Sequence, residues 1–111
     1  MSWGDSRMSP GSGTPIIQVD PAELHVPPGR LQGAEPGKLA RQLAQFGNTV
    51  VGMPPLELVR GKGGHYRIND GVTRATRIAK LLPGQTVPAI VIHDLPKLDV
   101  TRCPKIKEVL P

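Results

Sequence analysis

The sequence predicts a small α+β domain with a mixed sheet, a hairpin and two or three packed helices. Short apolar runs alternate with segments whose apolar residues recur every three or four positions, so strands and helices are interspersed. The expected order is strand, helix, strand, strand, helix, strand. A glycine-rich loop joins the second and third strands, which is typical of a hairpin. Helices then pack against a sheet in layers.

The first third of the chain is expected to hold a strand and a helix. Residues 16–19 are apolar enough for a short strand, and an Asp-Pro pair stops it. Residues 21–34 contain several prolines and glycines and should be mostly loop. The first helix is expected over residues 35–46, with a proline in its first turn and a glycine at its end. Its apolar stripe consists of Leu39, Leu43 and Phe46.

The second half of the chain contains the hairpin, a helix and the most apolar strand. Residues 56–60 and 65–69 are the two hairpin strands. A helix over residues 72–82 follows directly, because its apolar residues recur at helical spacing and Pro-Gly ends it. The last strand is expected over residues 87–92.

These elements place one domain at residues 15–95. Residues 1–14 are rich in serine and glycine and are expected to form a flexible leader. Residues 96–111 contain three prolines and are expected to form a C-terminal extension with a short helical turn near residues 106–110.

Composition limits the class of protein. The chain has 111 residues and only three aromatic ones, so aliphatic side chains must form a modest core. The formal net charge of +5 favours an anionic partner such as a nucleic acid, a nucleotide or an acidic protein, although an inert basic surface has the same charge. The single cysteine, Cys103, excludes a disulfide framework within the chain, and zinc-binding patterns are absent.

Hydropathy points to a domain outside the membrane. No apolar run approaches the length of about 20 residues that spans a bilayer. The N-terminus also lacks the apolar core of a secretory signal. We therefore expect a cytoplasmic location, or a secreted one if the domain is an effector module of a larger protein.

The junction between the second hairpin strand and the following helix carries the candidate site. The first N–H groups of a helix lack intrahelical partners, and the helix dipole adds positive charge there, so this junction suits a phosphate or a carboxylate. Gly71 lets a ligand approach the backbone closely, and Thr73 can donate a hydroxyl. Arg74 can grip an anion with two hydrogen bonds. Arg77 is expected one turn later on the same side, away from the apolar stripe.

A purely structural role explains the same residues. Asp70 would then cap the helix, as aspartate before a helix usually does, and Gly71 would only permit the turn. Arg74 would pair with Asp70 or with Glu57. The residues alone leave both interpretations open.

The segment from Gly64 to Arg74, the helix after it and the Val-Pro-Ala-Ile-Val-Ile strand are similar to the ParB/sulfiredoxin superfamily. In that family a strand leads into Gly-x-x-Arg, a helix and a short link to such a strand. Gly71 and Arg74 match the glycine and the arginine of the motif. The similarity covers about residues 16–94, and the Pro-Gly-Arg sequence ending at Arg30 resembles the family's arginine loop more loosely.

The resemblance implies a ParB/sulfiredoxin-like fold and a phosphate-bearing ligand, because the Gly-x-x-Arg motif of ParB-type proteins contacts the phosphates of a bound nucleotide. The expected partner is a nucleotide or a nucleic acid, with a protein partner as the alternative. No cofactor is assigned beyond a divalent metal that would accompany a nucleotide. Asp70 and Arg74 are the catalytic candidates. The ligand-binding candidates are Arg30, Gly71, Val72, Thr73, Arg74 and Arg77.

Two positions depart from the family pattern. ParB-type proteins carry a glutamate and a further arginine where this sequence has Val72 and Thr73, which argues against nucleotide hydrolysis of the chromosome-partitioning kind. Sulfiredoxins need a cysteine at the position of Val72, so we expect no sulfinic-acid reduction. The remaining expectations are a nuclease or nucleotide hydrolase, a non-catalytic nucleic-acid- or protein-interaction module, and a toxin domain of a polymorphic secreted bacterial protein.

Overall fold

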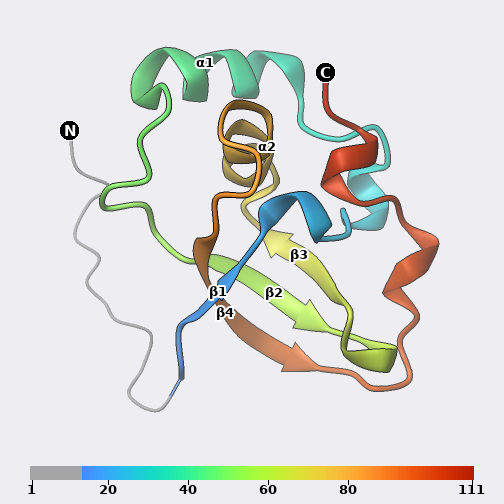
Figure 1. The fold of residues 1–111 in the computed structure, drawn as a ribbon. Helices are drawn as coiled ribbons and strands as arrows, with labels where there is room; N and C mark the ends of the chain where they lie inside the picture. Colours follow the sequence, from blue (N-terminus) through green and yellow to red (C-terminus); the bar gives the residue numbers. More distant parts are fainter. Residues whose placement is uncertain (1–13) are drawn as a thin grey trace.

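A computed structural model describes residues 14–111, and within them it contains two α-helices and a four-stranded sheet (Figure 1). The expected α+β class and the expected order of elements are confirmed. The strands and helices are β1 (Ile17–Val19), α1 (Pro36–Phe46), β2 (Leu56–Arg60), β3 (Tyr66–Asp70), α2 (Val72–Leu81) and β4 (Val87–Asp94). None of the described helices is long and apolar enough to cross a bilayer.

The sheet is mixed, with strand order β1-β4-β2-β3. β2 and β3 pair antiparallel, as the glycine loop predicts, whereas β4 pairs antiparallel with β1 and parallel with β2. The register of the hairpin places Glu57 opposite Asp70. The end of β3 and the start of β2 therefore lie side by side at one end of the strands. The junction between β3 and α2 lies at this same end of the sheet.

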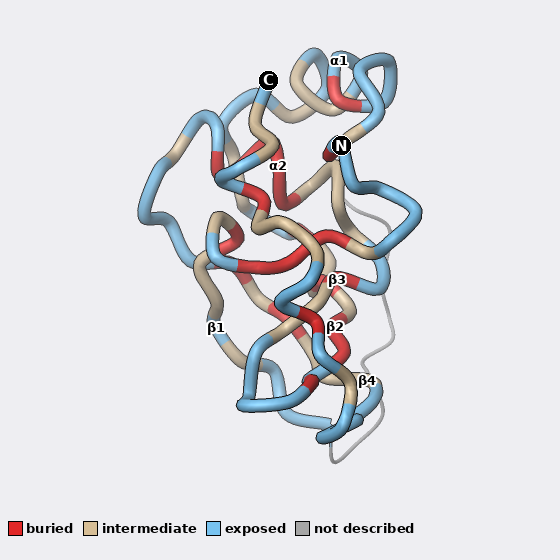
Figure 2. Tube along the Cα trace, turned by 90° about the vertical axis from the view of Figure 1, so that its right-hand side faces the viewer, coloured by how far each residue is buried: buried red, intermediate tan, exposed pale blue. Residues whose placement is uncertain are grey.

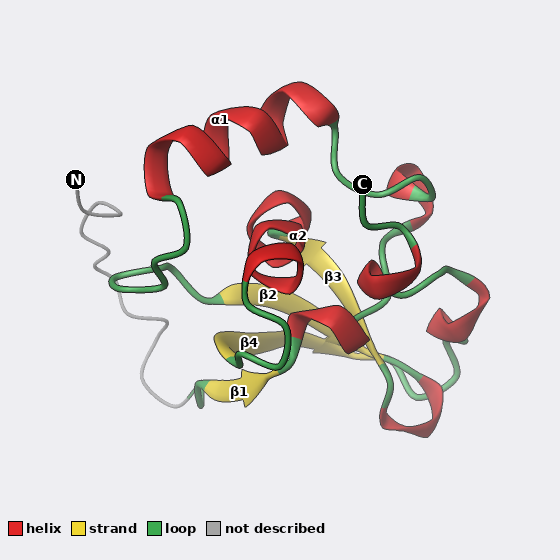
Figure 3. Cartoon of the chain, turned by 45° about the horizontal axis from the view of Figure 1, so that its top comes forward, coloured by secondary structure: helices red, strands yellow, loops and turns green. Residues whose placement is uncertain are grey.

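α2 lies between the sheet and α1, so the helices form two layers over one face of the sheet (Figures 1 and 3). A helix with one solvent-facing side buries a single stripe, but α2 buries five consecutive residues. Both faces of this helix are covered. The buried residues are Ala75, Thr76, Arg77, Ile78 and Ala79.

The hydrophobic core lies between α2 and the sheet (Figure 2). It is built from aliphatic side chains, as the scarcity of aromatic residues requires. The largest fully buried members of this cluster from the strands, from α2 and from the C-terminal segment are Leu56, Leu58, Ile68, Ile78 and Ile106.

The position of Arg77 differs from the sequence expectation. We expected this side chain on an exposed face beside the ligand, but it is fully buried. Its Nη1 donates to the carbonyls of Gly47 at 2.7 Å and Thr49 at 2.9 Å, and its Nε donates to Oε1 of Gln42 at 3.1 Å. The Phe46 ring lies 5.4 Å from its guanidinium carbon. The expectation was wrong because α1 covers the face of α2 that points away from the sheet.

The C-terminal segment, residues 96–111, contributes side chains to the same core. Ile106 is fully buried, and its N–H donates to the carbonyl of Leu24 at 2.8 Å. The N–H of Val26 donates in turn to the carbonyl of Pro104 at 2.9 Å. The expected helical turn is present as a short 3-10 helix, Ile106–Glu108. The leader predicted for residues 1–14 lies outside the described residues, except for its last residue.

We predict that replacing Arg77 by methionine destabilises the protein by about 3 kcal/mol, because the carbonyls of Gly47 and Thr49 then lose the charged donor that the buried side chain supplies. Urea unfolding followed by circular dichroism measures this loss. Arg41→Ala is the matched control, since Arg41 is exposed on α1 and should change the free energy of unfolding by less than about 0.5 kcal/mol. Equal stabilities of the Arg77→Met variant and the wild type would contradict this role.

Candidate functional site

The turn between β3 and α2 requires glycine. Gly71 has φ of +115°, a left-handed conformation that side-chain-bearing residues rarely adopt. A Cβ atom at this position would lie 2.5 Å from Cδ2 of Leu56 and 3.0 Å from Nη2 of Arg74. The glycine therefore allows both the turn and the close packing of β2 and Arg74 beneath it.

The N-terminus of α2 has no side-chain cap, because its N-cap residue is a glycine. Gly71 is the N-cap residue, and no side chain accepts a hydrogen bond at this cap, so Asp70 does not cap the helix. The first turn consists of Val72, Thr73 and Arg74, whose N–H groups precede the first intrahelical hydrogen bond, from Ala75 to Gly71. This end of the helix offers donors and partial positive charge to an anion.

A cleft of about 410 Å³ opens at this N-terminus. Its walls come from the loop after Val26, from α1 and from the junction between β3 and α2. The cleft brings together every predicted site residue except Arg77. The predicted residues that line it are Arg30, Asp70, Gly71, Val72, Thr73 and Arg74.

Sequence reasoning missed two residues of α1 that line this cleft. Lys38 and Gln42 both face it, and Gln42 also accepts the hydrogen bond from buried Arg77. The available signal was their spacing of four residues, which puts them on one polar side of the helix. That signal could not identify the site, because the sequence does not show which element α1 covers. Asn69, Gly29 and Pro27 complete the lining.

Arg74 is mostly buried but only loosely bonded. Its side chain is 17% exposed, and its Nη2 lies 3.7 Å from Oδ2 of Asp70 and 3.5 Å from the carbonyl oxygen of Pro55. Its buried Nε has no hydrogen-bond partner among the described residues. Burial lowers the pKa of Arg74, while the charges of Asp70 and Glu57 raise it. The structural role considered above is thus present in part, since both contacts are long for hydrogen bonds.

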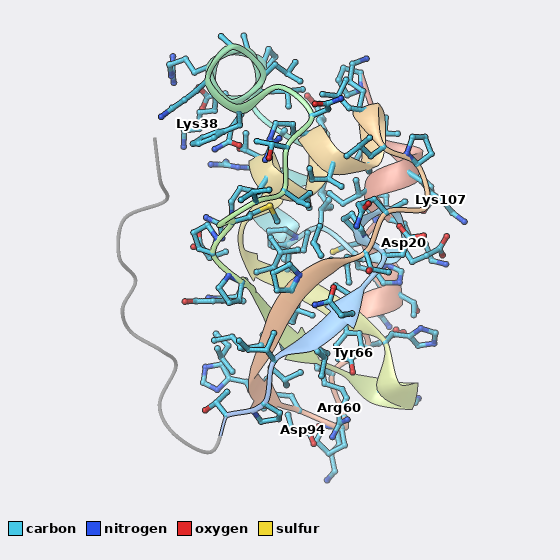
Figure 4. The ribbon with its side chains drawn as sticks, turned by 60° about the vertical axis from the view of Figure 1, so that its left-hand side comes forward. Asp20, Lys38, Arg60, Tyr66, Asp94 and Lys107 are labelled. Carbon is cyan, nitrogen blue, oxygen red and sulfur yellow. The ribbon has the colours of Figure 1, made fainter. Side chains whose placement is uncertain are left out.

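Positive charge predominates in the cleft. Arg30, Lys38 and Arg74 supply three cations, against the single carboxylate of Asp70. Lys38 is exposed and forms no ion pair within the described part of the chain, and among the same residues the side chain of Arg30 donates only to the carbonyl of Gly29, at 3.3 Å. The cationic end of the molecule is separate from the exposed Arg60–Asp94 ion pair at the far end of the sheet (Figure 4).

Asp70 supplies the one carboxylate among the residues that line the cleft. Its carboxylate is 67% exposed, and its nearest cation is Arg74. Residues 14–111 contain no group of three or more His, Cys, Asp or Glu side chains arranged to hold a metal ion. The cleft can therefore bind an anion through backbone amides and cationic side chains, and the Asp70 carboxylate lies in the same cleft.

No protein-family model matches this chain, and a search of curated proteins finds no match. The resemblance to the ParB/sulfiredoxin superfamily therefore stays a prediction from the motif around Gly71 and Arg74.

We predict that Gly71→Ala costs about 2–4 kcal/mol of stability, because a left-handed alanine is strained and its Cβ would meet Leu56. Gly84→Ala is the matched control, because Gly84 has φ of +88° with no heavy atom within 4 Å of an added Cβ. The control should lose only about 1–2 kcal/mol, the cost of the left-handed backbone. Chemical denaturation of both variants tests this, and equal losses would show that the close approach to Leu56 is unimportant.

Proposed function

We propose that this domain binds a phosphate-bearing ligand, a nucleotide or a nucleic-acid backbone, in the cleft at the N-terminus of α2. One observation carries the proposal: the uncapped end of α2 and the cations Arg30, Lys38 and Arg74 converge on one cleft from three separate segments. Free amides, a helix dipole and guanidinium groups together are the usual means of binding phosphate. The resemblance of the motif around Gly71 and Arg74 to the ParB/sulfiredoxin pattern points to the same class of ligand.

The positions that depart from the family pattern fit this function. Val72 and Thr73 carry no charge, so the phosphate contacts in the first turn of α2 would come from backbone N–H groups and the Thr73 hydroxyl. Charged contacts would come from Arg74 within the same turn and from Arg30 and Lys38 across the cleft. Each charge-assisted hydrogen bond of this kind contributes about 1.5–3 kcal/mol. The nucleotide or nucleic-acid ligand stays the primary proposal, with a protein partner as the alternative.

Hydrolysis of a phosphodiester or a nucleotide is the second candidate, and the exposed carboxylate of Asp70 in the cleft favours it. In this reaction water attacks phosphorus and Asp70 takes the water's proton, while the bond from phosphorus to the leaving oxygen breaks and that oxygen keeps the electron pair and takes a proton from solvent. Arg74 would stabilise the negative charge that develops on the phosphoryl oxygens. A divalent metal that accompanies the ligand could be held by Asp70 and the phosphates, as Mg²⁺ usually is.

We predict that Arg74→Ala weakens binding of a nucleoside triphosphate and of a short oligonucleotide by about 10- to 100-fold. Lys38→Ala should weaken both by about 3- to 10-fold, and because this side chain is exposed the fold should be unaffected. Fluorescence titrations at two salt concentrations measure these affinities. Lys97→Ala, which removes an exposed cation outside the cleft, should leave them unchanged.

Circular dichroism of each variant separates binding from folding. If Arg74→Ala fails to fold, the Lys38→Ala variant still tests the cleft. Wild-type affinity in the folded Arg74→Ala and Lys38→Ala variants would place the ligand elsewhere.

We predict that Asp70→Asn abolishes any turnover of phosphodiesters or nucleotides while binding is kept or strengthened, because the change removes the proton acceptor and one negative charge from the cleft. Product release assayed with and without Mg²⁺ measures turnover, and titration of the same variant measures binding. Salt-sensitive binding by the wild type without turnover would favour the non-catalytic module. Undiminished turnover in Asp70→Asn would exclude Asp70 as the base.

A further inference from the structure

A second depression continues the cleft along α1. It has a volume of about 310 Å³ and shares Lys38, Gln42 and Thr73 with the cleft. Its far end is lined by Arg41 and Gln45. The two depressions are therefore adjacent, and together they are called the groove, which extends from the N-terminus of α2 along the polar side of α1.

The groove carries positive charge along its length. Arg74 lies at its start, Lys38 lies where the two depressions meet, and Arg41 lies one turn further along α1. Arg41 is exposed and forms no ion pair with any residue in the described range. The part of α1 between Lys38 and Gln45 is about 10 Å long at 1.5 Å per residue. No carboxylate lines the second depression.

This arrangement suits a ligand longer than one nucleotide. Pockets for small ligands usually measure about 300–1,000 Å³, so the 410 Å³ cleft alone is large enough for a single small ligand. Cations that continue beyond it match an anion whose charges repeat along a chain. The phosphates of a nucleic-acid backbone have this repeating pattern.

We propose that the groove binds a single-stranded nucleic acid, with one phosphate at the N-terminus of α2 and the backbone running past Lys38 to Arg41. This inference rests on the proposed phosphate site and extends it. A flexible single strand can adapt its backbone to cations that lie at the end of one helix and on the side of another, whereas a stiff duplex pays a bending cost to do so over so short a distance.

The lining of the groove also indicates how the strand is recognised. Neither depression is lined by an aromatic side chain, so the described lining of the groove offers no platform on which bases stack. Binding then comes from the backbone charge, which gives a steep salt dependence and little preference for particular bases.

The test compares two ligands and three variants. A fluorescent single strand of about 12 nucleotides lies within the usual range of site sizes, and a nucleoside triphosphate probes the first cleft alone. Arg41→Ala should weaken oligonucleotide binding by about 3- to 10-fold and reduce the magnitude of the slope of log K against log salt by about 0.7. Its affinity for the triphosphate should stay at the wild-type value. Arg41→Lys should restore oligonucleotide binding, and Lys97→Ala should match the wild type.

The outcomes separate this inference from the proposed function. Three results would contradict binding of a single strand in the groove. They are wild-type oligonucleotide affinity in Arg41→Ala, an equal loss of affinity for both ligands in that variant, and tighter binding of a duplex than of the single strand. Each of these results leaves the phosphate site intact as long as Arg74→Ala still weakens triphosphate binding. If Arg74→Ala and Lys38→Ala bind both ligands like the wild type, the phosphate site itself is wrong and the groove with it.

Discussion

The buried guanidinium of Arg77 joins the two helices, and the position of the candidate site depends on this contact. It bonds the carbonyls of Gly47 and Thr49 just after α1, so the end of α1 is fixed against the outer face of α2. Its third partner is the amide oxygen of Gln42, which also lines the cleft. A buried charge is tolerated here because three oxygen atoms accept its hydrogen bonds in place of water. The contact places Lys38, one turn before Gln42, over the N-terminus of α2.

The opposite wall of the cleft is fixed by the C-terminal segment. Two backbone hydrogen bonds join the strand-like stretch at Leu24 and Val26 to Pro104 and Ile106, immediately before the loop that carries Arg30. Burial of Ile106 anchors this connection in the core. The cleft is thus formed by three segments that lie far apart in the sequence, and each of them is held against the core by its own contacts. Only the junction at Gly71 is built from residues that are neighbours in the sequence.

The two arginines of α2 illustrate how similar side chains take different roles. Arg74 and Arg77 are separated by about one helical turn, yet Arg77 satisfies its donors within the protein and Arg74 does not. A cation with unsatisfied donors beside uncapped amides is suited to bind an external anion. A cation whose donors are already bonded to carbonyl groups is suited to hold two helices together.

The order of the elements, the hairpin and the strand–glycine–helix junction could be predicted from the sequence, because they depend on local periodicity and on the backbone freedom of Gly71. Tertiary structure decided the role of Arg77, the contribution of Lys38 and the place of residues 96–111, because each depends on which face of α2 another segment covers. Periodicity identified the apolar stripe of α2 that packs on the sheet. It carried no information about α1 on the other side, since a buried arginine bonded to carbonyls and an exposed arginine have the same place in the helical pattern.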